Sequence, residues 1–280
     1  MNIEVNDLTK TFEEFKLDHI SIQIAKGKIV GLIGENGAGK TTLIKCIIDA
    51  MHFDSGEVLL FDKPYSADLK EDVGVVFDHS FMNETFTIQD INIIMKNIYK
   101  NWDSNRFFKY IKEFKIPLKK EIKKLSTGMK KKVEIATALS HHPKLLILDE
   151  PTSGLDPIIR SEILDMFEDY VSNGENSILL STHITSDLEH IADDVIFISK
   201  GKVIFDRPLQ DIKNDYVMLE LTFEEFDQFP KQDIIRKKKN RLDYQILIHK
   251  KSMKKNYEKY QKKFTTLDDI MLLYIKGEEV

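Results

Sequence analysis

The chain has 280 residues, of which 42% are hydrophobic and 31% charged, a balance typical of globular proteins that excludes wholesale disorder. Its formal net charge of −5 gives no global attraction to nucleic acid or acidic lipid, so any such attraction must come from a local patch. The single cysteine, Cys46, excludes an intramolecular disulfide, agrees with a reducing cytosol, and lies in an apolar run that predicts a buried core residue.

The N-terminal segment, residues 1–7, has no basic stretch leading into an apolar run, so we expect no signal peptide. The longest apolar runs, such as residues 145–148, fall far short of the roughly 20 residues that span a bilayer. If the protein works at a membrane, a different polypeptide must therefore supply the spanning helices.

Apolar runs alternate with helical stretches through the first 210 residues, which predicts an α/β core. The strands of an antiparallel edge are expected to be less apolar than the buried strands. Buried strands are predicted at 29–33, 73–77, 145–148, 177–181 and 195–198, and edge strands at 3–5, 20–24 and 57–61.

Two segments differ from this core in composition and in the pattern of their apolar residues. Lysine-rich, helix-forming sequence fills residues 84–142 and predicts a helical subdomain inserted into the core, with helices at 88–98, 107–114 and 129–139. After Pro208 the pattern changes again, with strands expected at 216–222 and 242–248 and a closing amphipathic helix at 267–275. We therefore predict a main α/β domain over 1–212 and a small α+β extension over 213–280.

A phosphate-binding motif lies directly after the predicted strand 29–33. Residues 34–41 read Gly-Glu-Asn-Gly-Ala-Gly-Lys-Thr and match G-x-x-x-x-G-K-[ST], and a helical run at 42–49 follows. Glycines let backbone N–H groups turn toward phosphates, and the helix N-terminus adds its positive dipole end. Lys40 is expected to reach the β- and γ-phosphates and the Thr41 hydroxyl to ligate Mg²⁺. The motif predicts a P-loop NTPase core.

Two carboxylates end the predicted strand 145–148. Asp149 is expected to hold Mg²⁺, usually through water, opposite the threonine of the phosphate loop. Glu150 can polarise a water for in-line attack on the γ-phosphate, as a general base or as an orienting group. A pair of solvated acids capping a strand is the alternative, and the neighbouring phosphate loop disfavours it.

With these motifs, the chain resembles the ABC ATPases over about its first 210 residues. Residues 125–129, Leu-Ser-Thr-Gly-Met, occupy the place of that family's signature Leu-Ser-Gly-Gly-Gln, twenty residues before the acidic strand end. Residues 153–156 resemble the family's D-loop, and His183 is similar to its switch histidine, which contacts the γ-phosphate. Phe12 lies 28 residues before the loop lysine, where the family stacks an aromatic ring on adenine.

The resemblance implies a mechanism in which two subunits clamp two ATP molecules head to tail. Ser126 and the Gly128 amide would then contact the γ-phosphate held by the second subunit, which is a copy of this chain or a paralogue. Hydrolysis separates the pair and drives a membrane permease. Motif and resemblance together predict three catalytic residues (Glu150, His183, Lys40), three metal ligands (Thr41, Asp149, Asp78) and the nucleotide contacts Phe12, Gly34, Asn36, Gly37, Ala38, Gly39, Lys40, Thr41, Thr42, Ser126, Gly128 and Asp156.

The chain departs from the family pattern in two places. In the signature, Thr127 replaces the first glycine and Met129 the glutamine, while the phosphate-contacting serine and second glycine are retained. After the predicted strand 73–77, Asp78 stands where the family has a glutamine that touches Mg²⁺ and the attacking water. Aspartate is shorter and charged, so it could ligate Mg²⁺ but would repel the γ-phosphate. We expect slower turnover or altered coupling, not inactivity.

Residues 236–263 carry twelve Lys/Arg against two acidic residues. A solvated lysine-rich surface is the simplest interpretation; contact with anionic lipid headgroups is the functional alternative, and nucleic-acid binding lacks an interleaved aromatic platform. Residues 266–271 resemble the C-terminal end of exporter-type ABC ATPases, which favours an export system for drugs or antimicrobial peptides in a bacterium.

The resemblance thus implies a Mg²⁺-dependent ATPase that lies in the cytoplasm, peripheral to the inner face of the cell membrane. The main alternative is a soluble ABC ATPase acting on nucleic acid, the ribosome or a protein. Such members carry coiled coils, zinc inserts or two cassettes, and the sequence has none of these, so no nucleic-acid partner is expected. A regulator without catalysis is disfavoured because Lys40, Asp149, Glu150 and His183 are retained.

Overall fold

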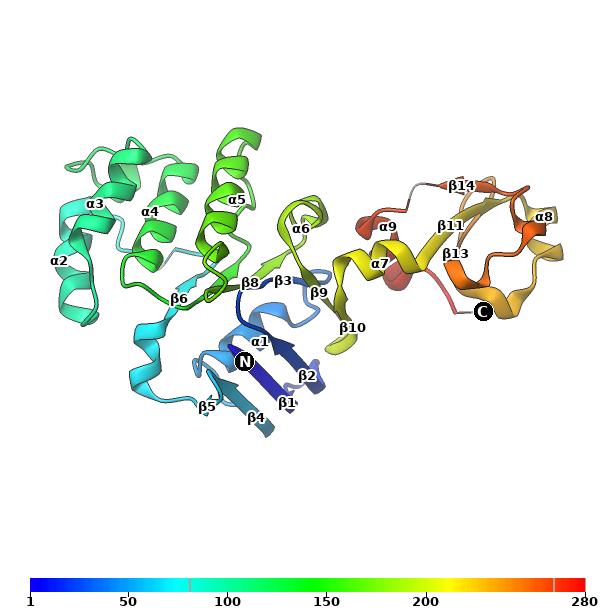
Figure 1. Ribbon diagram of the computed structural model, residues 1–280, viewed down its shortest axis with the longest axis horizontal. Helices are drawn as coiled ribbons and strands as arrows, with labels where there is room; N and C mark the ends of the chain where they lie inside the picture. Colours follow the sequence, from blue (N-terminus) through cyan, green and yellow to red (C-terminus); the bar gives the residue numbers. More distant parts are fainter. Residues whose placement is uncertain (81, 264, 280) are drawn as a thin grey trace.

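A six-stranded sheet forms the centre of the protein in a computed structural model that describes residues 1–80, 82–263 and 265–279 (Figure 1). Its strand order is β10-β9-β3-β8-β7-β6, with β10 alone running antiparallel to its neighbour. The parallel strands are those that the sequence predicts, with ends that differ by at most one residue. They are β3 (Ile29–Ile33), β6 (Val73–Val76), β7 (Leu145–Asp149), β8 (Ser177–Thr182) and β9 (Asp194–Ser199). The antiparallel strand β10 (Lys202–Pro208) is not among the predicted strands.

Both faces of this sheet are covered by other elements, which explains the continuous apolar runs in its strands. On one face pack α5 (Pro157–Val171) and α6 (Thr185–Ile191), which together bury residues such as Leu180 and Phe167. On the other lie α1 (Lys40–Ile47) and an antiparallel sheet of order β2-β1-β4-β5 (Figure 1). The strands of that sheet are β1 (Ile3–Thr11), β2 (Lys16–Ile24), β4 (Ser55–Leu60) and β5 (Lys63–Pro64).

Cys46 lies on the buried side of α1, where the sequence places a core residue. Burial raises the pKa of its thiol to about 11, so the thiolate is strongly disfavoured at neutral pH. The prediction of a structural cysteine is confirmed.

Three helices with a core of their own lie at one end of the sheet (Figure 1). They are α2 (Ile88–Ile98), α3 (Ser104–Glu113) and α4 (Thr127–Leu139). Two of them begin two or three residues before the predicted start, because a polar side chain caps each N-terminus. Asp103 accepts a hydrogen bond from the Arg106 amide, and Ser126 accepts one from the Met129 amide.

A second antiparallel sheet, of order β12-β13-β11-β14, lies at the far end of the molecule (Figure 1). Helix α7 (Leu209–Asp215) leads into β11 (Tyr216–Leu221), followed by α8 (Phe223–Gln228), β12 (Ile234–Lys239), β13 (Tyr244–His249), β14 (Gln261–Lys263) and α9 (Leu267–Lys276). Short 3₁₀ helices lie at Ala67–Asp72, Ile122–Lys124, Lys231–Asp233, Lys250–Ser252 and Lys255–Tyr257.

The closing helix α9 returns to the central part of the fold. Leu267, Ile270 and Met271 share a hydrophobic cluster with Leu188 and Ile191 of α6. The Leu267 amide also donates to Glu189 Oε1 at 2.7 Å. The C-terminal segment is therefore packed against the helix that follows His183. Across the described residues, no helix combines the length and the apolar character that a bilayer crossing requires.

Candidate functional site

The loop between β3 and α1 has the backbone geometry that its glycines permit. Gly37 and Gly39 have φ angles of 82° and 110°, which L side chains rarely adopt. A Cβ on Gly34 would lie 2.3 Å from the Ile198 carbonyl oxygen, so that position also excludes a side chain. The loop opens onto the N-terminus of α1, where free backbone N–H groups and the helix dipole favour an anion.

Lys40 folds over this loop. Its ammonium donates to the carbonyl oxygens of Gly34 at 2.7 Å and Glu35 at 3.3 Å, and the residue is only 7% exposed. Burial lowers the pKa of Lys40 against the opposing effect of Glu150 and Asp149. Phosphate oxygens held in the loop would favour the charged form of this amine, so anion binding and the lysine charge support each other.

The Thr41 hydroxyl and Asp149 meet beside the loop. Thr41 Oγ1 donates to Asp149 Oδ2 at 2.8 Å, from the start of α1 to the end of β7. Asp149 is 2% exposed, and its Oδ1 has no hydrogen-bond partner within the described part of the chain. A buried carboxylate oxygen without a partner, next to a hydroxyl, is a donor set that fits a hard, oxygen-seeking cation such as Mg²⁺.

Glu150 and His183 come together from the ends of β7 and β8. His183 Nδ1 lies 2.7 Å from Glu150 Oε2, and the His183 amide donates to the same oxygen at 3.4 Å. Glu150 Oε1 lies 4.0 Å from Lys40 Nζ, so the carboxylate sits between the histidine and the phosphate loop. Glu150 has a φ of 50°, an uncommon conformation for a residue with a side chain.

A cavity of about 600 Å³ is lined by residues of the phosphate loop and by Asp149 and Glu150. Its volume is within the range of small-molecule sites. Thr42 and Asn36 line it, whereas Ala38 is 2% exposed and lies outside the lining. The full lining is Glu14, Phe15, Glu35, Asn36, Gly37, Gly39, Lys40, Thr41, Thr42, Asp78, Asp149 and Glu150.

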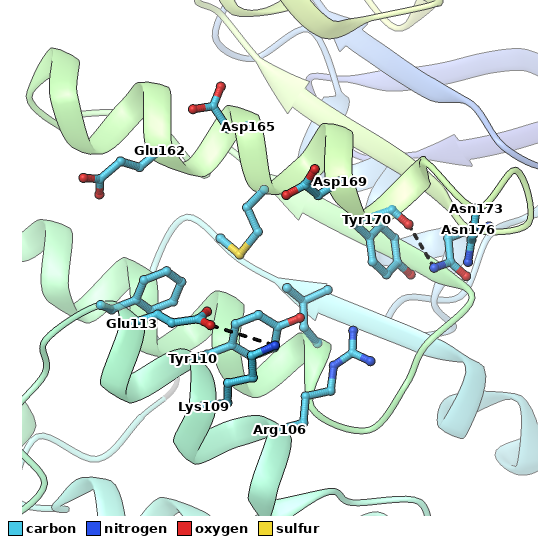
Figure 2. A pocket seen from close by; sticks show the side chains of 13 residues that line it. Arg106, Lys109, Tyr110, Glu113, Glu162, Asp165, Asp169, Tyr170, Asn173 and Asn176 are labelled. Atoms are coloured by element: carbon cyan, nitrogen blue, oxygen red, sulfur yellow. Dashed lines mark hydrogen bonds and ion pairs between the residues drawn. The ribbon is translucent and has the colours of Figure 1, made fainter.

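Another cavity, of about 560 Å³, lies between α3 and α5 (Figure 2). Arg106 and Lys109 lie on its α3 side, and Glu162, Asp165 and Asp169 on its α5 side. Its lining contains none of the predicted nucleotide, metal or catalytic residues, so we assign the nucleotide to the cavity at the phosphate loop.

Phe15 lines the cavity, whereas the predicted Phe12 is not part of its lining. Phe15 packs against Gly39, where an added Cβ would lie 2.7 Å from its ring. Phe12 is 41% exposed, with its ring centroid 6.2 Å from that of Phe15 and outside the cavity lining. The adenine-stacking role of Phe12 stays a prediction, and Phe15 is a residue that the spacing argument missed.

Seven predicted residues lie outside this cavity lining: Phe12, Gly34, Ala38, His183, Ser126, Gly128 and Asp156. The last three lie at the starts of α4 and α5. Ser126 caps α4, and Asp156 caps α5 by accepting from the Ile158 and Ile159 amides at 3.1 Å. A Cβ on Gly128 would lie 2.6 Å from Ile159, so the signature helix packs tightly on α5. This placement is what we expect of groups that serve a second subunit's nucleotide.

Asp78 lines the cavity, with its side chain about half exposed. Its backbone is tied to the signature helix by Lys131, whose ammonium donates to the carbonyl oxygens of Phe77 at 3.0 Å and Asp78 at 3.4 Å. The buried carboxylate of Glu134 lies 3.0 Å from the same ammonium. Sequence reasoning missed this link, because a lysine in a lysine-rich helix gives no sign that it is buried.

Comparisons with known proteins agree with this site. Residues 17–153 match the family model described as ABC transporter. The bacitracin transport ATP-binding protein BcrA of Bacillus licheniformis is 33% identical over 75% of this chain and 71% of its own length. The lantibiotic transport ATP-binding protein SrtF of Streptococcus pyogenes is 30% identical over 78% and 98%. The ABC transporter ATP-binding protein YtrB of Bacillus subtilis is 28% identical over 79% and 77%.

Solved structures agree as well. An ATP-binding subunit of an ABC transporter is 27% identical, with a TM-score of 0.69 over 76% of this chain and 92% of its own. A dimeric ATP-binding cassette bound to ADP and Pi has a TM-score of 0.67 over 74% and 98%; at 21% identity its likeness extends to the fold alone. With the phosphate loop and the two carboxylates at one cavity, the chain belongs to the ABC transporter family, as an ATP-binding subunit that hydrolyses ATP.

Proposed function

We propose that this ATPase powers export of an antimicrobial compound through a separate membrane-spanning subunit. The observation that carries the proposal is the similarity to the bacitracin and lantibiotic transport proteins, which extends over 71% and 98% of their lengths. Export then places the subunit in the cytoplasm, peripheral to the inner face of the membrane. A soluble ABC ATPase that acts on nucleic acid or the ribosome remains the alternative, and no described feature favours it.

Deleting the gene from its host tests the export proposal. We expect higher sensitivity to at least one compound of a panel that includes bacitracin and a lantibiotic, because the exporter loses its energy source. The wild-type chain should restore resistance, whereas Glu150→Gln should not. Unchanged sensitivity across the panel, or full complementation by Glu150→Gln, would contradict the proposal.

At the site itself, the loop amides and Lys40 bind and orient the β- and γ-phosphates. Thr41, Asp149 and Asp78 would hold Mg²⁺, and a bound Mg²⁺ would neutralise phosphate charge and favour attack at phosphorus. Glu150 orients the attacking water and accepts its proton. The bond between His183 Nδ1 and Glu150 supports this role, because it fixes the direction of the carboxylate.

The clamp requires a second subunit, a copy of this chain or a paralogue. In the clamp, Ser126 and Gly128 of one subunit face the nucleotide of the other from the N-terminus of α4, and Asp156 lies at the adjoining surface. Support comes from their position outside the chain's own cavity and from the packing of Gly128 on Ile159. This close packing couples the signature to the start of α5.

A smaller cavity of about 260 Å³ is the proposed contact site for a cytoplasmic helix of the membrane subunit. It lies at the end of α1 and against β6, and its lining includes Tyr65, Phe77 and Tyr99. Phe77 directly precedes Asp78, so a helix seated here would contact the segment that enters the nucleotide cavity. Support is the mainly apolar and aromatic lining, in which Asp49 and Lys70 are the charged residues and which suits the apolar face of a helix.

Tyr65→Asp tests this contact. A carboxylate in this mainly apolar groove opposes helix docking by about 2 kcal/mol or more when it is left unpaired. We expect transport-dependent resistance to fall while the basal ATPase activity of the purified chain stays within about twofold. Lys70→Ala, at the edge of the same cavity, is the control and should retain resistance. Equal resistance in Tyr65→Asp and Lys70→Ala would place the membrane contact elsewhere.

Asp78→Gln tests the departure from the family pattern. Glutamine removes a negative charge next to the phosphates, so we expect basal ATPase turnover to rise, by roughly tenfold for each 1.4 kcal/mol of repulsion that is relieved. Steady-state kinetics of the purified chain measure the change, and Asp78→Glu, which keeps the charge, is the control. If Asp78→Gln leaves both basal and transport-coupled ATPase unchanged, the aspartate has no such effect.

We also propose the division into an ATPase domain, 1–212, and an extension, 213–280, with a helical subdomain over 84–142. The separate hydrophobic cluster in the extension supports it. Within the basic segment 236–263, Arg236, Lys237, Lys254 and Lys263 are paired with acidic groups. Four of the twelve basic residues are thus neutralised locally, which weakens the attraction of the segment for anionic lipid.

A further inference from the structure

Asp187 is a buried carboxylate in α6, close to the catalytic segments but outside the nucleotide cavity. It is 1% exposed. Its two oxygens accept from two different segments: Oδ2 from the Thr152 hydroxyl at 2.6 Å, and Oδ1 from the Arg160 Nε–H. A charged, fully paired group at this depth forms charge-assisted hydrogen bonds that hold their partners firmly.

Each partner of Asp187 belongs to a segment with its own role in hydrolysis. Thr152 lies two residues after Glu150. Arg160 is in the first turn of α5, and its amide donates to the Asp156 carbonyl at 3.0 Å. Asp187 itself lies four residues after His183. One carboxylate therefore connects the segments that carry the water-orienting glutamate, the D-loop aspartate and the switch histidine.

The connection to Arg160 is reinforced by the neighbouring residue. Arg160 Nη2 donates to the Ser186 hydroxyl at 2.7 Å, so the guanidinium is fixed at two points on α6. A planar guanidinium held in this way allows little rotation of α5 relative to α6.

Glu150 needs such support because of its backbone. Its φ of 50° lies in the left-handed region, which is unfavourable for a residue with a side chain. Neighbouring contacts must hold this conformation. The Glu150 amide donates to the Ser181 carbonyl at 2.9 Å on one side, and Asp187 fixes Thr152 on the other. Loss of the hydrogen bond between Thr152 and Asp187 would let the Glu150 carboxylate move away from its position at the cavity.

We propose that Asp187 is a positioning residue for ATP hydrolysis, whose carboxylate aligns Glu150, His183 and the start of α5 without touching the nucleotide. The negative charge is essential to this role, since an amide in its place offers one acceptor oxygen where two donors converge. Nucleotide affinity is independent of it, because the phosphate loop and α1 make no hydrogen bond to Asp187 among the described residues.

Asp187→Asn in the full-length chain tests the proposal. We expect kcat for ATP hydrolysis to fall about tenfold or more while KM for ATP changes by less than about twofold, the pattern of a lost transition-state contribution. Asp187→Glu, which restores the charge with one more methylene, should recover part of kcat. A purely structural carboxylate would lower the melting temperature without this separation of kcat from KM.

Two further variants each remove one of the two hydrogen-bond partners of Asp187. Thr152→Val removes one hydroxyl at nearly constant volume and should lower kcat alone. Arg160→Gln releases α5 and should weaken ATP-induced association of subunits, measured by light scattering in a background of Glu150→Gln. Both variants change side chains outside the cavity lining, so neither should alter ATP binding itself.

Asp269→Asn is the matched control, since Asp269 is also a largely buried carboxylate, which caps α9 and pairs with Lys263. It should lower the melting temperature and leave kcat unchanged. The proposal is overturned if Asp187→Asn keeps wild-type kcat, or if Asp269→Asn lowers kcat to the same extent. Should Asp187→Asn fail to fold, Thr152→Val decides: a wild-type kcat in that variant also overturns the proposal.

Discussion

Replacing Glu150 by glutamine is expected to lower kcat for ATP hydrolysis by about two to four orders of magnitude while ATP binding persists. Glutamine keeps the size of the side chain but cannot accept the proton of the attacking water. The phosphate loop, Lys40 and Thr41 are untouched, so the affinity for ATP should stay near that of the parent chain. A phosphate-release assay gives kcat, and isothermal titration with ATP gives Kd.

Glu14→Gln is the matched control, because Glu14 lines the same cavity and makes no contact with His183 or Lys40 among the described residues. It should retain parental kcat. If Glu150→Gln keeps more than about a tenth of the parental rate, the carboxylate is not the group that activates water.

Lys40→Met is expected to weaken ATP binding by about two orders of magnitude, since truncating one partner of a buried charge pair costs roughly 2–5 kcal/mol. Methionine preserves the aliphatic packing of this nearly buried side chain but offers no ammonium to the phosphates. Binding of a fluorescent ATP analogue, displaced by ATP, measures the change.

Lys45→Met, on the same helix α1 but outside the cavity lining, is the control for Lys40→Met. It should bind ATP like the parent chain. An unchanged Kd in Lys40→Met would contradict the assignment of the loop as the phosphate site, and equal weakening in both variants would point to damage to α1.

The sequence predicts the central sheet and the phosphate loop well because their signals are local. Strands buried on both faces appear as continuous apolar runs, and the β3 run ends directly in Gly34 and the glycines that follow. The same local logic finds Asp149 and Glu150, because they end a buried strand. The structure brings these groups to one cavity with Lys40 and Thr41.

The remaining features depend on tertiary contacts that a linear pattern does not carry. The choice between Phe12 and Phe15 as the aromatic ring at the cavity depends on how the turn after β1 folds onto Gly39. Strand β12 carries Arg236 and Lys237 half-buried, so its charges conceal the strand pattern. The roles of Asp187 and Lys131 depend on hydrogen-bond partners that lie 27 and 54 residues away in the sequence.

ATP held in the loop is expected to join two subunits, and Glu150-dependent hydrolysis is expected to separate them. Static light scattering of purified Glu150→Gln, with and without ATP and Mg²⁺, tests this most directly. We expect a monomer without nucleotide and a stable dimer with ATP, while the parent chain under turnover forms at most a transient dimer. A variant that binds ATP yet stays monomeric, with the parent chain hydrolysing ATP as a monomer, would contradict the clamp.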